Sequence, residues 1–297
     1  MSIEHTAAAA GTWPLGDVTV NRMGFGAMRI TANPDRSVAI RVLRRAVELG
    51  VDHIDTAAFY ASPGGTLGVG EGPVRYANEL IRAALAPYPD GLVITTKVGP
   101  GEHADRGFYQ ATTAAELRTQ VETNLRQLGL DYLDVVNLRI IKKVGADSIA
   151  DRFGALADLR DAGLIRQLGV SNVRADHVEE ALAIAPVVCV QNSYAIDQRR
   201  DEDALIKLCA ERDIAYVPFF AIAGASREEG AAADHSAAVQ AIATARGVTP
   251  QQVRLAWTLH QSGNVLAIPG TGNPAHLEEN IAAGALRLSP GELAILY

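Results

Sequence analysis

Eight short runs of β-branched and other apolar residues recur along the chain, and each is followed by a longer stretch with helical periodicity. Strands that alternate with helices in this way pair in parallel. Eight such units favour closure into a (β/α)8 barrel, the TIM-barrel form of the α/β class, over the alternative of a doubly wound open sheet, which periodicity alone does not exclude. The predicted strands are residues 23–27, 53–55, 92–97, 132–138, 167–170, 187–191, 215–219 and 265–268.

Helices are predicted between these strands, and Gly50, Gly129 and Gly163 follow helical stretches where a left-handed C-cap favours glycine. Residues 12–20 are expected to form a hairpin at the barrel bottom, and helices beyond the regular pattern are expected near the carboxyl end. With no linker, the chain is predicted to be one domain over residues 1–297. The predicted helices are residues 37–49, 73–86, 114–128, 148–162, 174–183, 202–212, 236–246, 250–261 and 274–283.

Composition narrows the class of protein. Of the 297 residues 48% are hydrophobic, enough for a large core. The formal net charge is −7, so a nucleic-acid partner is not expected. The two cysteines, Cys189 and Cys209, lie in apolar or amphipathic stretches and are expected to be buried thiols. We find no signal-peptide pattern and no apolar run of about 20 residues, so we expect a cytoplasmic protein, monomeric or homo-oligomeric, without a membrane partner.

Charged residues end two of the predicted strands. Asp55 ends one buried strand and Lys97 ends the next, and an unpaired charge in a core is costly, so we expect the two to pair. Tyr60 follows Asp55 closely. Because an ammonium stabilises a phenolate, the three residues together predict a proton donor for a carbonyl oxygen, although each one alone is more often structural.

Neutral polar groups end the next strands. Ser171 and Asn172 follow one strand and Gln191 ends its neighbour, which suits an uncharged amide ligand such as the nicotinamide carboxamide. The alternative is that Ser171 or Asn172 caps the following helix.

These residues, taken in order, resemble the aldo-keto reductase family over about residues 24–280. The motifs are Gly-Val-Asp-His-Ile-Asp-Thr-Ala at 50–57 with Tyr60, Thr-Thr-Lys-Val-Gly around Lys97, Gly-Val-Ser-Asn at 169–172, Gln191, Ile-Pro-Gly-Thr-Gly at 268–272 and Leu-Glu-Glu-Asn at 277–280.

The resemblance implies reduction of an aldehyde or ketone to an alcohol with NADP(H), with the substrate a small carbonyl compound. It implies Tyr60 as general acid, Lys97 as the residue that tunes it and Asp55 as the ion-pair partner. Ser171, Asn172 and Gln191 would hold the carboxamide, and Phe219 would stack on the nicotinamide ring. The remaining implied cofactor contacts are Gly270, Thr271, Gly272, Asn273, His276, Glu279 and Asn280.

Arg139 stands where the family usually has a catalytic histidine. An arginine donates hydrogen bonds but does not relay protons near neutral pH, so we expect activity with altered substrate preference. The string Asp-Val-Val-Asn-Leu-Arg at 134–139 resembles a pyridoxal reductase-like branch, which makes a pyridoxal-like aromatic aldehyde the leading substrate. Phe25, Arg29 and Arg139 are the expected substrate contacts, and the two arginines suit an anionic or phenolic group.

The cofactor segment departs from the family as well. Many members hold the 2′-phosphate with basic residues where this chain has Asn273 and His276. Backbone amides at the helix start near Pro274 could still bind phosphate. NADPH is therefore expected first, and NAD(H) use stays open.

Two other functions remain as alternatives. His53 and Asp55 could be half of a metal site in a barrel hydrolase, but further converging ligands are not evident, so no metal is expected. A regulatory protein that binds the cofactor with little turnover is the other alternative, and the intact Asp55, Tyr60 and Lys97 set argues against it.

Overall fold

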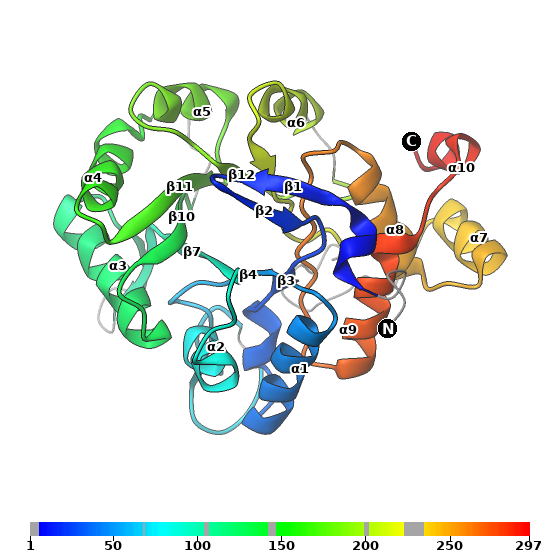
Figure 1. Ribbon diagram of the computed structural model, residues 1–297, viewed down its shortest axis with the longest axis horizontal. Coiled ribbons are helices and arrows are strands. Elements are labelled where there is room, and N and C mark those ends of the chain that lie inside the picture. The colour runs from blue at the N-terminus through cyan, green and yellow to red at the C-terminus, as the bar shows by residue number, and fades with distance from the viewer. Residues whose placement is uncertain (1–5, 68, 104–106, 142–146, 199–201, 223–234) are drawn as a thin grey trace.

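A curled parallel sheet forms the centre of the molecule, and helices surround it (Figure 1). The computed structural model describes residues 6–67, 69–103, 107–141, 147–198, 202–222 and 235–297. Seven strands pair in the order β13-β12-β11-β10-β7-β4-β3. Their bounds are β3 Phe25–Gly26, β4 His53–Asp55, β7 Val93–Val98, β10 Leu133–Arg139, β11 Ile165–Ser171, β12 Cys189–Gln191 and β13 Ala215–Tyr216.

The predicted eighth strand closes this sheet into a ring, although it pairs through isolated bridges. Val265 bridges Tyr216, and Ala267 bridges Met23. The backbone N–H of Leu266 donates to the Tyr216 carbonyl at 2.9 Å, and that of Gly24 donates to the Ala267 carbonyl at 2.8 Å. The segment therefore joins the last strand to the first, which confirms the (β/α)8 barrel over the open sheet.

The helices lie close to their predicted positions. One prediction is wrong at its start: residues 73–76 do not join α2, because Arg75 and Tyr76 pair as strand β6 with β5 (Ala61–Ser62). An extra helix near the carboxyl end, expected without bounds, is present as α10. The helices are α1 Arg36–Glu48, α2 Ala77–Leu85, α3 Ala114–Leu128, α4 Ala150–Asp161, α5 Ala175–Leu182, α6 Glu202–Ala210, α7 Ala237–Arg246, α8 Pro250–His260, α9 Pro274–Ala282 and α10 Pro290–Leu296, with 3-10 turns η2 Ala7–Ala10, η3 Met28–Thr31 and η5 Ala283–Ala285. Among these helices none is long and apolar enough to cross a membrane.

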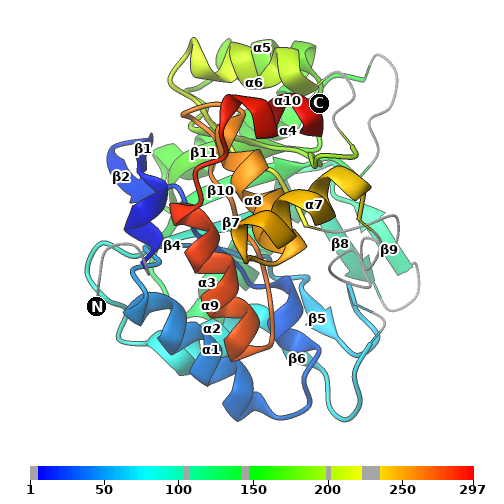
Figure 2. The ribbon, with the colours of Figure 1, turned by 90° about the vertical axis from the view of Figure 1, so that its right-hand side faces the viewer.

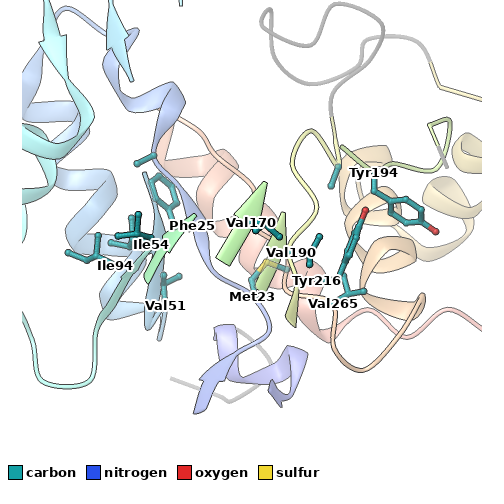
Figure 3. Close-up of a cluster of buried hydrophobic side chains, with 14 of the residues drawn as sticks. Met23, Phe25, Val51, Ile54, Ile94, Val170, Val190, Tyr194, Tyr216 and Val265 are labelled. Atoms are coloured by element: carbon teal, nitrogen blue, oxygen red, sulfur yellow. The ribbon is translucent and has the colours of Figure 1, made fainter. Parts of the chain in front are cut away.

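Alternation along the strands divides the apolar core in two. One set of side chains faces the helices and includes Phe25, Ile54 and Tyr216 (Figure 3). The other set forms a smaller cluster with Val93, Val135, Cys189 and Leu266. Residues on these strands two positions apart share a side, so the second cluster and the polar strand ends Asp55 and Gln191 both face the barrel interior.

A hairpin of β1 (Thr12–Leu15) and β2 (Val18–Asn21) packs on the interior cluster, as predicted for the barrel bottom. Leu15 and Val20 are buried in that cluster. At the tip, Asp17 accepts hydrogen bonds from Arg166 at 2.7 Å and Gln167 at 3.0 Å, two residues of β11. Hairpins β5–β6 and β8–β9 (Pro100–His103, Gly107–Gln110) lie at the opposite end (Figure 2). The amino-terminal end of the barrel is thus filled, and the other end carries loops.

Candidate active site

Asp55 and Lys97 form a buried ion pair at the carboxyl ends of neighbouring strands. Lys97 Nζ donates to Asp55 Oδ1 at 2.6 Å and to the Thr56 carbonyl at 2.9 Å. The Lys97 and Asp55 side chains are 1% and 5% exposed. Two buried charges need such a partner, because each would otherwise lose its hydration without compensation. The predicted pairing is confirmed.

Tyr60 lies against this pair. Backbone bonds fix its position: its N–H donates to the Ala57 carbonyl at 3.0 Å, and its own carbonyl accepts from Ala77 at 2.9 Å. The ammonium of Lys97 lies 4.8 Å from the centre of the Tyr60 ring. A phenol, an ammonium and a carboxylate from separate segments therefore meet at the barrel mouth.

His53 faces the interior one layer below Asp55 but serves the fold. Its Nε2 lies 2.9 Å from the carbonyl oxygen of Asn21. Burial lowers the pKa of His53 from 6.5 to about 4, so the ring is neutral near pH 7 and Nε2 donates. Both carboxylate oxygens of Asp55 already accept hydrogen bonds, one from Lys97 and one from Gln191. Among the described residues no group of three acidic, histidine or cysteine side chains could hold a metal ion.

Ser171, Asn172 and Gln191 come together at the ends of β11 and β12, where Ser171 and Gln191 are in register. Neither Ser171 nor Asn172 caps α5, whose N-cap is Arg174. Ser171 Oγ accepts from Arg139 at 3.0 Å and keeps its proton to donate. Asn172 Nδ2 donates to the carbonyls of residues 140 and 141, which leaves Oδ1 as an acceptor.

The amide of Gln191 completes this set. Its Nε2 donates to Asp55 Oδ2 at 2.7 Å, while its Oε1 is buried and has no partner among the described residues. One donor (Ser171) and two acceptors (Asn172, Gln191) match a primary carboxamide, which offers one acceptor and two donors. The residues present therefore fit a nicotinamide.

Arg139 ends β10 and extends over Phe219. Its guanidinium carbon lies 4.7 Å from the centre of the Phe219 ring. Phe219 in turn contacts Phe220 edge to face at 5.2 Å between ring centres. Arg139 thus joins Ser171 and Phe219, two residues predicted to contact the cofactor, and this link was not predictable from the sequence.

A cavity of about 650 Å³ opens at this end of the barrel, a size typical of small-molecule sites. Its polar lining comes from Arg29, Asp55, Tyr60, Thr66, Arg139 and Asn172. Burial lowers the pKa of Arg29 from its ordinary value. The aromatic and apolar walls come from Met28, Phe59, Phe108, Ile141, Pro218, Phe219, Phe220 and Ile222.

Phe25 does not line this cavity. It is in register with Ile54 on β4, and both side chains are fully buried in the helix-facing core (Figure 3). The residue that does reach the cavity from β3 is the next one, Gly26. Alternation along the strand explains the difference, so we correct the predicted substrate contact at Phe25.

The cofactor segment lies beside β3. A Cβ on Gly270 would come within 2.4 Å of the Gly26 carbonyl oxygen, so the two backbones approach closely at that point. Thr271 Oγ1 accepts from the Asn273 N–H at 3.0 Å, and Asn273 Oδ1 caps α9 by accepting from Ala275 at 2.9 Å. Gly270 reaches the cavity, whereas Gly272 lies near the Arg29 backbone. His276 and Glu279 are exposed on α9, and Asn280 is buried.

Several lining residues were not predicted. Phe59 and Phe108 contact each other edge to face at 6.4 Å between ring centres, and Phe108 comes from the β8–β9 hairpin. Phe59 follows β4 in a loop, and β9 has only four residues, so periodicity could not select either phenylalanine. Most of residues 140–147 and 221–234 lies outside the described residues.

The barrel, the acid group and the amide-binding set define an oxidoreductase that acts on carbonyl compounds. The chain belongs to the aldo/keto reductase family, whose model matches residues 22–296. Among curated proteins, it is 44% identical to pyridoxine 4-dehydrogenase of Escherichia coli over 97% of this chain and 98% of that protein. An uncharacterised oxidoreductase of Schizosaccharomyces pombe is 36% identical over 95% of this chain and 88% of its own length.

Solved structures agree with the barrel. An aldo/keto reductase from Klebsiella pneumoniae, crystallised with NADP and acetate, is similar with a TM-score of 0.77 at 28% identity and covers 96% of this chain and 93% of its own. A thermostable aldo-keto reductase in complex with the inhibitor epalrestat gives a TM-score of 0.75 at 29% identity, covering 96% of this chain and 98% of its own. The family assignment favours carbonyl reduction over the metal-dependent and regulatory alternatives.

Proposed function

We propose that this aldo-keto reductase converts a pyridoxal-like aromatic aldehyde to its alcohol with NADPH, and that Tyr60 supplies the proton. The observation that carries the proposal is the buried Lys97–Asp55 pair against the Tyr60 ring, inside a cavity with aromatic walls. The 44% identity to a pyridoxine 4-dehydrogenase supports the substrate class.

Nicotinamide, when bound, supplies the hydride that reduces the carbonyl carbon. Ser171, Asn172 and Gln191 would hold its carboxamide, and the Phe219 ring would pack against its face. The close approach of Gly26 and Gly270 forms the adjoining wall. These groups would fix which face of the nicotinamide ring is turned toward the substrate, since an amide held at three points cannot rotate freely.

The proton comes from the Tyr60 hydroxyl, which donates to the carbonyl oxygen as negative charge develops there. The Lys97 ammonium favours the phenolate that remains, because opposite charges attract strongly away from water. Asp55 keeps the ammonium in place through the 2.6 Å contact. The site thus stabilises the charge that appears during the reaction.

Arg139 and Arg29 would select the substrate. A guanidinium stays charged near neutral pH, so Arg139 can donate hydrogen bonds to an oxygen but cannot return a proton. Four phenylalanines around the same cavity favour a flat ring. A planar aldehyde with a phenolic or anionic oxygen satisfies both features.

NADPH is proposed as the first cofactor, with NADH as an accepted second. Recognition of a 2′-phosphate by α9 is limited, because Pro274 has no N–H and the Ala275 N–H is capped by Asn273. The exposed His276 is the remaining basic side chain at this turn. Weak charge recognition is consistent with modest discrimination between the two cofactors.

The test follows NADPH and NADH absorbance separately with pyridoxal, other aromatic aldehydes and simple ketones. We expect pyridoxal to give the highest kcat/KM. Tyr60→Phe should lower kcat by about 10²- to 10⁴-fold with cofactor affinity retained, because it removes the proton and little else. Lys97→Met should impair kcat similarly.

Unchanged turnover in Tyr60→Phe would exclude this acid. Tight NADPH binding by the unaltered protein without multiple turnovers on any carbonyl would favour the regulatory alternative instead.

A further inference from the structure

Gln191 reaches across the barrel interior to Asp55. It ends β12, which is separated from β4 by three strands in the sheet order. Its Nε2 donates to Asp55 Oδ2 at 2.7 Å, while Lys97 holds Oδ1 of the same carboxylate at 2.6 Å. Gln191 is fully buried. The two oxygens of Asp55 are therefore held by residues from different sides of the barrel.

The orientation of the Gln191 amide follows from this contact. An ionised carboxylate only accepts hydrogen bonds, so the NH2 end of the amide must face Asp55. The carbonyl end must then point away from Asp55, and its Oε1 is buried without a partner among the described residues. A buried acceptor of this kind calls for a donor from a ligand.

We propose that Gln191 is a positioning residue for the proton donor: one end of its amide accepts from the nicotinamide carboxamide, and the other end holds Asp55 against Lys97. This inference rests on the proposed function. Cofactor binding and acid catalysis would thereby share one side chain, and polarisation of the amide from one end strengthens the bond at the other.

The bond from Gln191 limits how far Asp55 neutralises Lys97. Without it, the carboxylate would rely on Lys97 alone, and less of the ammonium's field would reach Tyr60. The other titratable groups facing Asp55 are His53 on β4 and Cys189 on β12. Arg29 and Arg139 share the cavity with Tyr60, and the interior residues of β10 and β11 nearest the pair, Asn137 and Ser171, are neutral.

The experiment compares Gln191→Leu with Ser171→Ala. Both should weaken NADPH binding by about tenfold in fluorescence titrations without substrate, because each removes one carboxamide contact. At saturating NADPH, Gln191→Leu should also lower kcat by about tenfold. The alkaline limb of its kcat–pH profile should move up by about one pH unit. Ser171→Ala, which does not touch Asp55, should keep the limb of the unaltered enzyme.

Gln191→Glu preserves the shape of the side chain. It replaces Gln191→Leu as the deciding variant if circular dichroism shows that Gln191→Leu does not fold. A protonated Glu at this position can donate to Asp55 as the amide does, and an ionised one cannot. We expect kcat near that of the unaltered enzyme at low pH and a fall as the new carboxyl group ionises, a limb that the unaltered enzyme lacks.

The inference is overturned if Gln191→Leu, or Gln191→Glu where the former is unfolded, keeps the kcat and pH limbs of the unaltered enzyme at saturating NADPH. That result would leave the reductase intact and restrict Gln191 to cofactor binding. Failure of the proposed function is a different result, since the unaltered enzyme would then show no turnover, or Tyr60→Phe would keep the turnover of the unaltered enzyme.

Discussion

His53 makes the pH dependence of stability predictable at the scale of one residue. Its folded-state pKa is about 4 and its ordinary value is 6.5. Between these values the unfolded chain binds a proton that the native protein excludes, so the free energy of unfolding falls as the pH drops through this window. From pH 7 to pH 5 the loss should be about 2 kcal/mol.

His53→Gln is the matched variant, because a glutamine amide can still donate to the Asn21 carbonyl but does not titrate. Urea unfolding at pH 7 and pH 5 measures the free energy of both proteins. We expect the unaltered protein to lose about 2 kcal/mol more than the variant. Equal losses would mean that His53 binds a proton in the native protein at pH 5 as readily as in the unfolded chain.

At the scale of elements, the β1–β2 hairpin lies at the opposite end of the barrel from the β8–β9 hairpin (Figure 2), and β8–β9 contributes Pro100 and Phe108 to the cavity. Leu15→Ala removes a side chain that is 2% exposed, so the free energy of unfolding should fall by about 2–5 kcal/mol. Thr19→Ala, on the exposed side of the same hairpin, should change it by less than about 0.5 kcal/mol. Urea denaturation gives both values.

Catalysis provides the control for this pair. Below the unfolding temperature, kcat and KM of Leu15→Ala should match those of the unaltered enzyme, because the hairpin does not touch the cavity. A lower kcat with normal secondary structure would show that the barrel bottom is coupled to its mouth.

At the scale of the whole molecule, cofactor binding should stabilise the barrel. A ligand at 100 times its Kd adds about 2.7 kcal/mol to the native state, which predicts a rise of roughly 5 °C in Tm for a chain of this size. NADH should give a comparable rise at the same multiple of its own Kd. EDTA should leave both Tm and turnover unchanged, and a loss of activity with EDTA would revive the metal-dependent alternative.

The barrel was predictable because its signals are local. Strand and helix periodicity recur over short windows, and Asp55 and Lys97 each end a strand that the sequence marks clearly. Contacts between distant segments could not be predicted in the same way: the bond from Arg139 to Ser171, the aromatic contact between Phe59 and Phe108 and the reach of Gln191 to Asp55 depend on side-chain rotamers. Phe25 was assigned to the wrong side because a shift of one residue in a strand reverses the direction of its side chain.

The hairpin that fills the amino-terminal end of the barrel also determines by which end the substrate and the cofactor reach the site. With that end packed by Leu15 and Val20, both small molecules have to arrive and depart past one rim. The groups proposed to grip the nicotinamide, Ser171 and Gln191, are fully buried, whereas Phe108 on the outer wall is 56% exposed. Because the nicotinamide is proposed to lie deeper than the substrate, we expect the cofactor to bind before the aldehyde and to leave after the alcohol.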